Sequence, residues 1–222
     1  EAVPGVERAC KVQWLGANFE GERVQWAQFG VDPDDFGPSY PELEVVKGSY
    51  AGFAGDRAGC LIGEDLAAEY GWGLNDRVSL EGTIFQRADG GAWDFTVQGI
   101  YRSKTTNLDN RTLFFDFSYL RESLEQGAAY GPSGAGTYVL DIQDGIEPSQ
   151  VMADVDTLFE NGPQRVQTTT EAEFQRQFVS MLGSVPTLLG AIGGMIKFGV
   201  IGLFIGAVIL GLAYQIITDW LW

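Results

Sequence analysis

The chain has 222 residues and a net charge of −16, with 45% hydrophobic and 20% charged residues. This balance excludes an intrinsically disordered chain, because enough apolar side chains are present to bury a core. The acidic excess lies before Pro186, since Lys197 and Asp219 cancel beyond it, and it argues against a nucleic-acid partner.

The sequence contains no histidine, which removes the usual catalytic triads and most catalytic zinc sites. Its two cysteines, Cys10 and Cys60, form no Cys-x-x-Cys pair. Two interpretations stay open: a disulfide between them if the domain is extracytoplasmic, or two buried thiols that behave as small apolar residues. The sequence begins at Glu1 with no visible signal peptide, so a fragment edge is one expectation for this end.

The first third of the chain predicts strands separated by breakers. Alternating side chains predict strands over residues 6–15 and 24–30, joined by a turn. Residues 31–50 hold several Pro and Asp residues, which favour a loop with a short helical turn. Residues 59–62 read as a short apolar strand. It leads into a helix over residues 63–70, whose early carboxylates suit a helix N-terminus.

The remainder mixes strands and helices. An antiparallel pair is predicted over residues 77–86 and 93–101, with a turn at 88–91. A strand at 112–117, a helix at 118–126, a glycine-rich mobile stretch at 127–136 and a strand at 137–142 are expected next. A helix follows at 148–160, with one apolar stripe made of Val151, Val155, Leu158 and Phe159. The last expected elements are a strand at 165–168 and an amphipathic helix from Glu171. This order predicts an α+β fold with a mixed or antiparallel sheet, in one or two lobes.

Residues 198–217 form an uncharged run long enough to cross a membrane as a helix. Lys197 precedes this run, and Trp220 and Trp222 follow it as interfacial aromatics. Gly202 and Gly206 stand four residues apart, a spacing that allows a second helix to approach closely. We therefore expect one C-terminal transmembrane helix that packs on a partner helix through these glycines.

No catalytic constellation is recognisable in the sequence. The acidic run from Asp32 to Asp35 has the charge density of a calcium loop but lacks its glycine and terminal glutamate. A solvated turn is the preferred interpretation. We expect no enzyme activity, no cofactor and no metal site.

Several motifs in order resemble one family of membrane proteins. Gly5-Val6-Glu7-Arg8-Ala9 is followed by Gly63-Glu64-Asp65-Leu66-Ala67 and by Gly71-Trp72-Gly73-Leu74-Asn75-Asp76-Arg77-Val78-Ser79-Leu80. Phe95-Thr96-Val97-Gln98-Gly99-Ile100-Tyr101 then completes the series. This order is similar to the extracytoplasmic core domain of MacB-like and FtsX-like ABC permeases. Asn75 stands where that family has a glycine before an aspartate, so a left-handed turn is expected there.

The resemblance covers about residues 5–190 and implies a role in transport rather than catalysis. It implies an inner-membrane location with the N-terminal domain outside the cytoplasm, and as partners an ABC ATPase subunit, further permease helices and membrane lipid. A homodimer or an extracytoplasmic partner protein are further options. The resemblance also implies an N-terminal span ahead of the core domain, which would precede Glu1. From residue 198 the tail looks more like the end of the autoinducer-2 exporter family.

The expected organisation has four parts. Residues 1–170 form the MacB-like core domain, 171–197 a connecting amphipathic helix, 198–217 the transmembrane helix and 218–222 a short tail. The expected function is the extracytoplasmic domain and membrane anchor of an export or mechanotransmission permease. The alternative is a membrane-anchored binding or adaptor protein with no transport role.

Overall fold

The computed structural model describes residues 3–105, 108–160, 162, 166–170 and 173. The chain divides into two compact units, Glu1–Glu147 and Pro148–Trp222. The predicted segments 171–197, 198–217 and 218–222, with Gly202 and Gly206, lie outside the described residues apart from residue 173. Across the described ranges, no helix combines the length and apolarity that a membrane crossing requires.

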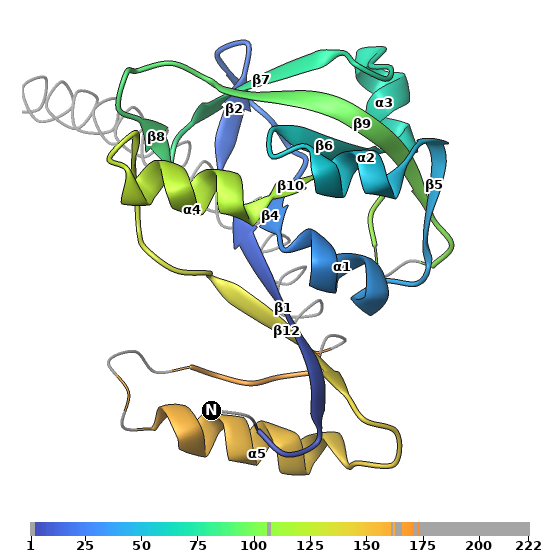
Figure 1. Cartoon of the computed structure of the whole chain (residues 1–222), viewed down its shortest axis with the longest axis vertical. Coiled ribbons are helices and arrows are strands. Elements are labelled where there is room, and N and C mark those ends of the chain that lie inside the picture. Colours follow the sequence, from blue (N-terminus) through green and yellow to red (C-terminus); the bar gives the residue numbers. More distant parts are fainter. Residues whose placement is uncertain (1–2, 106–107, 161, 163–165, 171–172, 174–222) are drawn as a thin grey trace, which may run out of the picture. The chain divides into compact units, whose positions relative to one another are not determined.

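The first unit is organised by one mixed sheet (Figure 1). Its strands are β1 (Val6–Trp14), β2 (Ala17–Phe19), β3 (Glu22–Arg23), β4 (Gln28–Val31), β5 (Leu43–Gly48), β6 (Gly59–Gly63), β7 (Arg77–Gly82), β9 (Trp93–Ser103), β10 (Leu113–Asp116) and β12 (Thr137–Ile142). They lie in the order β12-β1-β4-β10-β6-β9-β7-β2-β3, and β5 pairs with β9. The pairs β4–β10 and β6–β9 are parallel and the others are antiparallel. The predicted α+β fold with a mixed sheet is therefore confirmed.

Strand β9 is the hub of this sheet because it pairs with three strands. β6 follows one side of it, while β7 and β5 share the other. The register places Val78 of β7 opposite Phe95, and Val45 of β5 opposite Tyr101. The predicted antiparallel pair of β7 and β9 is thus confirmed. A separate two-stranded sheet joins β8 (Gln86–Arg87) to β11 (Ala129–Tyr130).

Alternating side chains in the central strands feed two hydrophobic clusters. In β6, Cys60 and Ile62 enter one cluster while Leu61 enters the other. In β10, Phe115 joins the cluster of Cys60 and Phe114 joins that of Leu61. Because successive strand residues point to opposite faces, these strands are buried on both faces and read as continuous apolar runs.

Four helices of the first unit supply the outer walls of these clusters. They are α1 (Pro33–Ser39), α2 (Tyr50–Gly55), α3 (Glu64–Tyr70) and α4 (Phe117–Glu125). Phe36 of α1 and Phe53 of α2 join the cluster of Leu61, whereas Leu66 of α3 and Leu120 of α4 join the other. The sheet is therefore covered by different helices on its two sides.

A left-handed turn connects α3 to β7, as the sequence predicts. Asn75 has φ 66, and its N–H donates to the Val97 carbonyl at 2.8 Å. The Val97 N–H donates in turn to the Asp76 carbonyl at 3.0 Å. Asparagine is the residue after glycine that tolerates this conformation best, so Asn75 can hold this turn.

Residues 31–50 are more structured than predicted. Instead of a loop with one helical turn they contain α1 and β5, and α2 begins at Tyr50. Pro33 occupies the first turn of α1, where its missing N–H costs nothing. β5 was missed because its edge position depends on pairing with β9, which lies about 50 residues further along the chain.

Other boundaries differ for local reasons. The strand predicted to run to residue 86 ends at Gly82, where a Cβ atom would lie 1.8 Å from the Phe85 carbonyl oxygen. Only glycine permits that turn, and β8 is a separate strand. Residues 166–168 form no strand, contrary to prediction.

The second unit contributes one described helix, α5 (Pro148–Phe159). Its predicted position is confirmed. Val151 and Val155 are buried as the stripe predicts, whereas Leu158 and Phe159 are each 40% exposed. The predicted stripe is therefore correct over its first half only.

Candidate functional site

Both ends of the first unit leave its sheet through one pair of strands. Val6 at the start of β1 lies opposite Ile142 at the end of β12. Beyond them, the Gln143 N–H donates to the Gly5 carbonyl at 2.9 Å. We call this pair the β1–β12 ribbon, and Figure 1 shows the two strands running side by side. The two ends of the unit are therefore attached to neighbouring strands.

The ribbon is tied to the rest of the unit at Asp141. The Asp141 carboxylate accepts from Arg8 of β1 at 3.0 Å and from the Ser39 hydroxyl, at the end of α1, at 2.7 Å. One β12 side chain thus connects both strands of the ribbon to a helix that packs on the sheet. A charged hydrogen bond of this kind is stronger than a neutral one.

A hollow lined by four aromatic rings lies at the other end of the sheet order, beside β2 and β3. Tyr70 and Trp72 stack with centroids 4.6 Å apart, and Phe19 meets both edge-on at 5.4 and 5.2 Å. Trp26 is buried beneath them and donates from Nε1 to the Tyr70 hydroxyl at 3.1 Å. The hollow measures about 640 Å³, within the size range of small-ligand sites. We call it the aromatic hollow.

Charged side chains form the rim of the aromatic hollow. Glu20, Glu22, Glu69, Arg23 and Arg111 line it. Glu69 and Arg111 pair at 2.6 Å and neutralise each other. The remaining rim is two carboxylates against one guanidinium, so it is weakly acidic.

A second hollow of about 590 Å³ lies beside α1, α2 and β5. Three prolines contribute to it together with Tyr50, whose hydroxyl donates to the Pro33 carbonyl at 2.6 Å. Burial raises the pKa of Tyr50, so this hydroxyl stays protonated and holds the start of α1.

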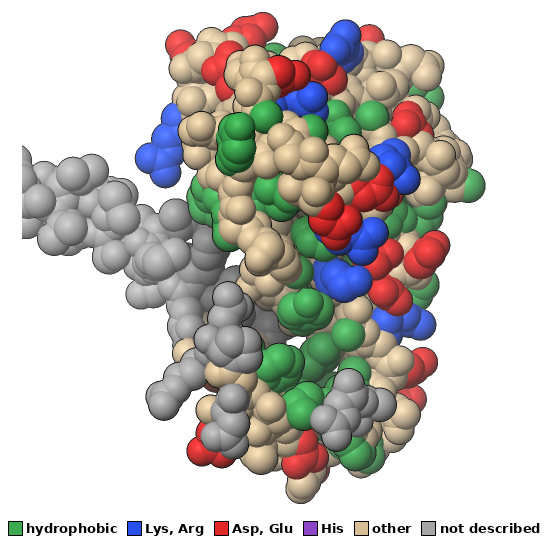
Figure 2. Space-filling model, turned by 60° about the vertical axis from the view of Figure 1, so that its left-hand side comes forward, with side chains coloured by type: hydrophobic (Ala, Val, Ile, Leu, Met, Phe, Trp, Pro, Cys, Tyr) green, Lys and Arg blue, Asp and Glu red, His purple; other side chains and the backbone are tan. Residues whose placement is uncertain are grey.

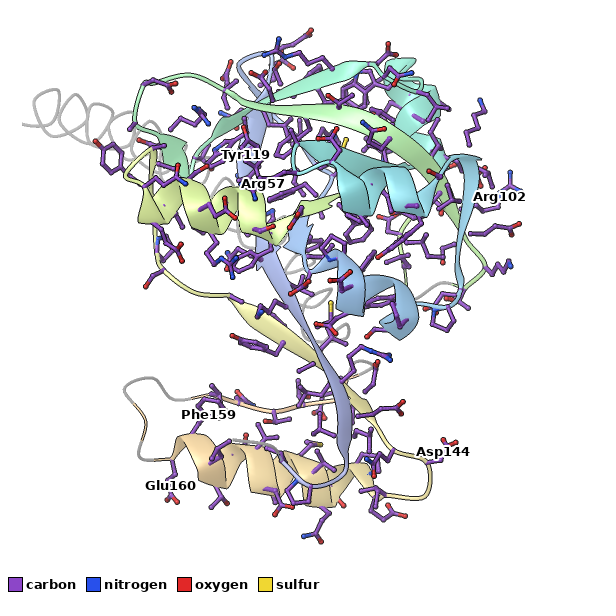
Figure 3. All side chains as sticks on the ribbon, in the orientation of Figure 1. Arg57, Arg102, Tyr119, Asp144, Phe159 and Glu160 are labelled. Carbon is purple, nitrogen blue, oxygen red and sulfur yellow. The ribbon has the colours of Figure 1, made fainter. Side chains whose placement is uncertain are left out.

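Several basic side chains of the described surface lie next to acidic ones in Figure 2. The nine that form ion pairs are Arg8, Lys11, Arg57, Arg77, Arg87, Arg102, Lys104, Arg111 and Arg121. Among the labelled residues of Figure 3, Arg57 pairs with Glu122 of α4, and Arg102 makes two bonds to Glu64 at 2.6 and 2.7 Å. Because these basic side chains are paired with nearby carboxylates, the unpaired carboxylates make up the acidic excess of the described surface.

The shifted pKa values in this structure have structural causes. Hydrogen bonds from Arg102 hold the pKa of Glu64 below its ordinary value. Arg77 and then Ser79 lower the pKa of Asp94 in the same way. Burial raises the pKa of Tyr101, whose hydroxyl donates to the Asp109 and Thr112 carbonyls. These groups stabilise the fold, and none of these shifts brings a group toward neutral pH.

Cys10 and Cys60 are free, buried thiols, so the disulfide interpretation is not supported. The strands that carry them are separated by β4 and β10, a span of roughly 14 Å at the usual strand spacing, whereas a disulfide needs Cα atoms within about 7 Å. Their side chains also enter different hydrophobic clusters. Burial raises the pKa of Cys10 to about 11 and raises that of Cys60 as well.

Sequence reasoning missed the aromatic hollow. Its rings come from positions 19, 26, 70 and 72, and only Tyr70-Gly71-Trp72 is a local signal. The acidic run near Asp32 forms the start of α1, and Asp32 pairs with Lys11 at 3.5 Å. Within the described ranges, no group of three or more potential metal ligands comes together.

Residues 1–158 match the family profile described as the MacB-like periplasmic core domain. Among solved structures, the extracellular domain of the noncanonic ABC-type transporter YknZ from Gram-positive bacteria is 14% identical. That match has a TM-score of 0.52 and covers 76% of this chain and 84% of that one. The periplasmic region of MacB from Actinobacillus actinomycetemcomitans is 8% identical with a TM-score of 0.46, covering 79% and 77%. At 14% identity the likeness to the YknZ domain concerns the fold alone.

Two curated relatives from Buchnera aphidicola match over short stretches. Both are provisionally named as transport proteins. The one from subspecies Schizaphis graminum is 49% identical over 51 residues, which is 21% of this chain and 14% of the relative. The one from subspecies Baizongia pistaciae is 52% identical over 40 residues, which is 18% and 11%. The chain thus spans only about a seventh or less of these relatives.

Proposed function

Because the chain belongs to the family of MacB-like periplasmic core domains, which are extracytoplasmic domains of ABC-type permeases, we propose that it transmits ATP-driven motion of membrane helices. The observation that carries the proposal is the family match over residues 1–158. The transmitted motion would drive substrate export or a signal to a partner protein. ATP hydrolysis itself would belong to a separate ATPase.

The β1–β12 ribbon supports this proposal mechanically. A helix linked beyond either end of the first unit would act on adjacent strands, Val6 being opposite Ile142. A relative shift of the two linked segments would therefore shear one strand pair. Asp141 would carry that shift to β1 through Arg8 and to α1 through Ser39.

The same proposal includes a membrane anchor. The uncharged run at residues 198–217 would span the inner membrane, with Gly202 and Gly206 facing a further permease helix. The first unit would lie outside the cytoplasm. The permease helices, an ABC ATPase subunit and lipid are the proposed partners, with a second copy or an extracytoplasmic protein as further options.

Membrane fractionation with identification of co-purifying proteins tests the proposal. The full chain is compared with a version that ends at Val185, which lacks the apolar run. We expect the full chain in the membrane fraction together with an ABC ATPase, and the shortened chain in the soluble fraction. A full chain that enters the membrane without an ATPase would instead support an anchored binding or adaptor protein.

A further inference from the structure

The aromatic hollow has no role in the transmission of motion described above. It is formed within the first unit, from the β2–β3 hairpin, the segment that follows it and the C-terminal end of α3. Phe19, Tyr70 and Trp72 are only partly buried. Tyr70 and Trp72 each cover one face of the other ring by stacking, and with Phe19 they line the hollow.

Ring chemistry and rim charge favour the same class of ligand. The faces of tryptophan and tyrosine rings attract cations, tryptophan most strongly. Once Glu69 and Arg111 have paired, Glu20 and Glu22 outnumber Arg23 on the rim. The chain's net charge of −16 adds a long-range attraction for cations. An anionic ligand would meet opposition from all three features.

The backbone of Glu20, which carries one rim carboxylate, adopts a strained left-handed conformation. Glu20 and Gly21 form the two-residue turn between β2 and β3, with φ 52 and 77. Both positions of such a turn favour glycine or asparagine, yet the first is a glutamate. A strained residue of this kind at the edge of a hollow is typical of a functional position.

We propose that the aromatic hollow binds a small soluble organic cation, of the alkylammonium type, with its charged group against the rings of Trp72 and Tyr70 and near Glu20 and Glu22. The volume of about 640 Å³ accommodates a ligand of this size. The site is independent of the proposed coupling to an ATPase, so measurements of ligand binding alone test it.

Calorimetric titration of the full chain in mild detergent tests the site, with choline as the probe. 3,3-Dimethylbutan-1-ol, which has a carbon in place of the nitrogen, is the uncharged control of the same shape. We expect saturable binding of choline and at least tenfold weaker binding of the alcohol. Equal binding of the two compounds, or no saturable binding of choline, overturns the proposal.

Three variants locate the binding. Trp72→Leu is expected to weaken choline binding about tenfold, because leucine has no aromatic face to attract the cation. Trp72→Phe should weaken it by less, because phenylalanine keeps an aromatic face that attracts cations less strongly than tryptophan. Glu20→Asn removes a rim carboxylate while it suits the left-handed turn, so it should weaken binding several-fold without lowering the unfolding temperature. Glu7→Gln is the matched control, because it removes one negative charge, as Glu20→Asn does, from an exposed position on β1. Equal losses in Glu20→Asn and Glu7→Gln would indicate general attraction to an acidic surface and contradict the site.

Discussion

Replacement of Gln28 by leucine probes how the corner between β1 and β2 is held. Gln28 is 2% exposed, its Oε1 accepts from the Ala17 N–H at 3.2 Å, and its Nε2 donates to the Trp26 carbonyl. Leucine fits the volume but leaves both backbone groups without this partner. Each buried polar group left unpaired costs about 1–3 kcal/mol. For the two groups together, we expect Gln28→Leu to lower the free energy of unfolding by about 2–6 kcal/mol.

The assay is denaturant unfolding of the full chain in mild detergent, followed by tryptophan fluorescence. Gln86→Leu is the control, because Gln86 is exposed on β8, and surface changes usually stay within about 0.5 kcal/mol. A loss of several kcal/mol is a large fraction of the 5–15 kcal/mol typical of a domain, so the two variants should separate clearly. If Gln28→Leu unfolds at the same denaturant concentration as Gln86→Leu, the Gln28 side chain does not stabilise the corner.

Three further predictions concern single groups. Cys10 and Cys60 should resist alkylation at pH 8 in the native protein, because both are buried free thiols with raised pKa values. In denaturant without reductant both should react, as counted by mass spectrometry. A disulfide between them would leave neither cysteine reactive. The pKa of Asp94 is lower in the folded protein than its ordinary 3.8, so its stabilising effect is present above that value and is lost as the pH falls below it. Asp94→Asn should therefore reduce the acid sensitivity of unfolding, and an unchanged pH profile would argue against the Arg77 pair. Asn75→Gly should leave stability equal or higher, whereas Asn75→Ala should lower it by roughly 1 kcal/mol, and equal effects in thermal unfolding would exclude a left-handed Asn75.

Local sequence signals predicted those elements whose stability is set nearby. The strand at residues 137–142 and the helix that begins at Pro148 were placed correctly because alternation and a proline in the first turn mark them. The left-handed Asn75 was also predicted, from the resemblance to a family that has a glycine before the aspartate at this position. In each case a short stretch of sequence contains the physical cause.

Features that depend on distant partners escaped prediction. β5 is a strand because β9 offers it an edge, and the sequence around residue 45 carries only weak alternation. The aromatic hollow needs Phe19 and Trp26 to meet Tyr70 and Trp72, more than 40 residues away. Neither contact leaves a local pattern, because long-range pairing overrides local propensity.

Hydrogen exchange in the purified membrane complex tests the coupling most directly. Amide exchange is compared with and without a non-hydrolysable ATP analogue, first with the ATPase present and then without it. The account predicts that, with the ATPase, the analogue changes exchange in the β1–β12 ribbon, near Val6 and Ile142, while amides of β6 in the sheet centre stay constant. Without the ATPase no change is expected. Unchanged exchange throughout residues 6–142 in the complete complex would contradict transmission through this domain.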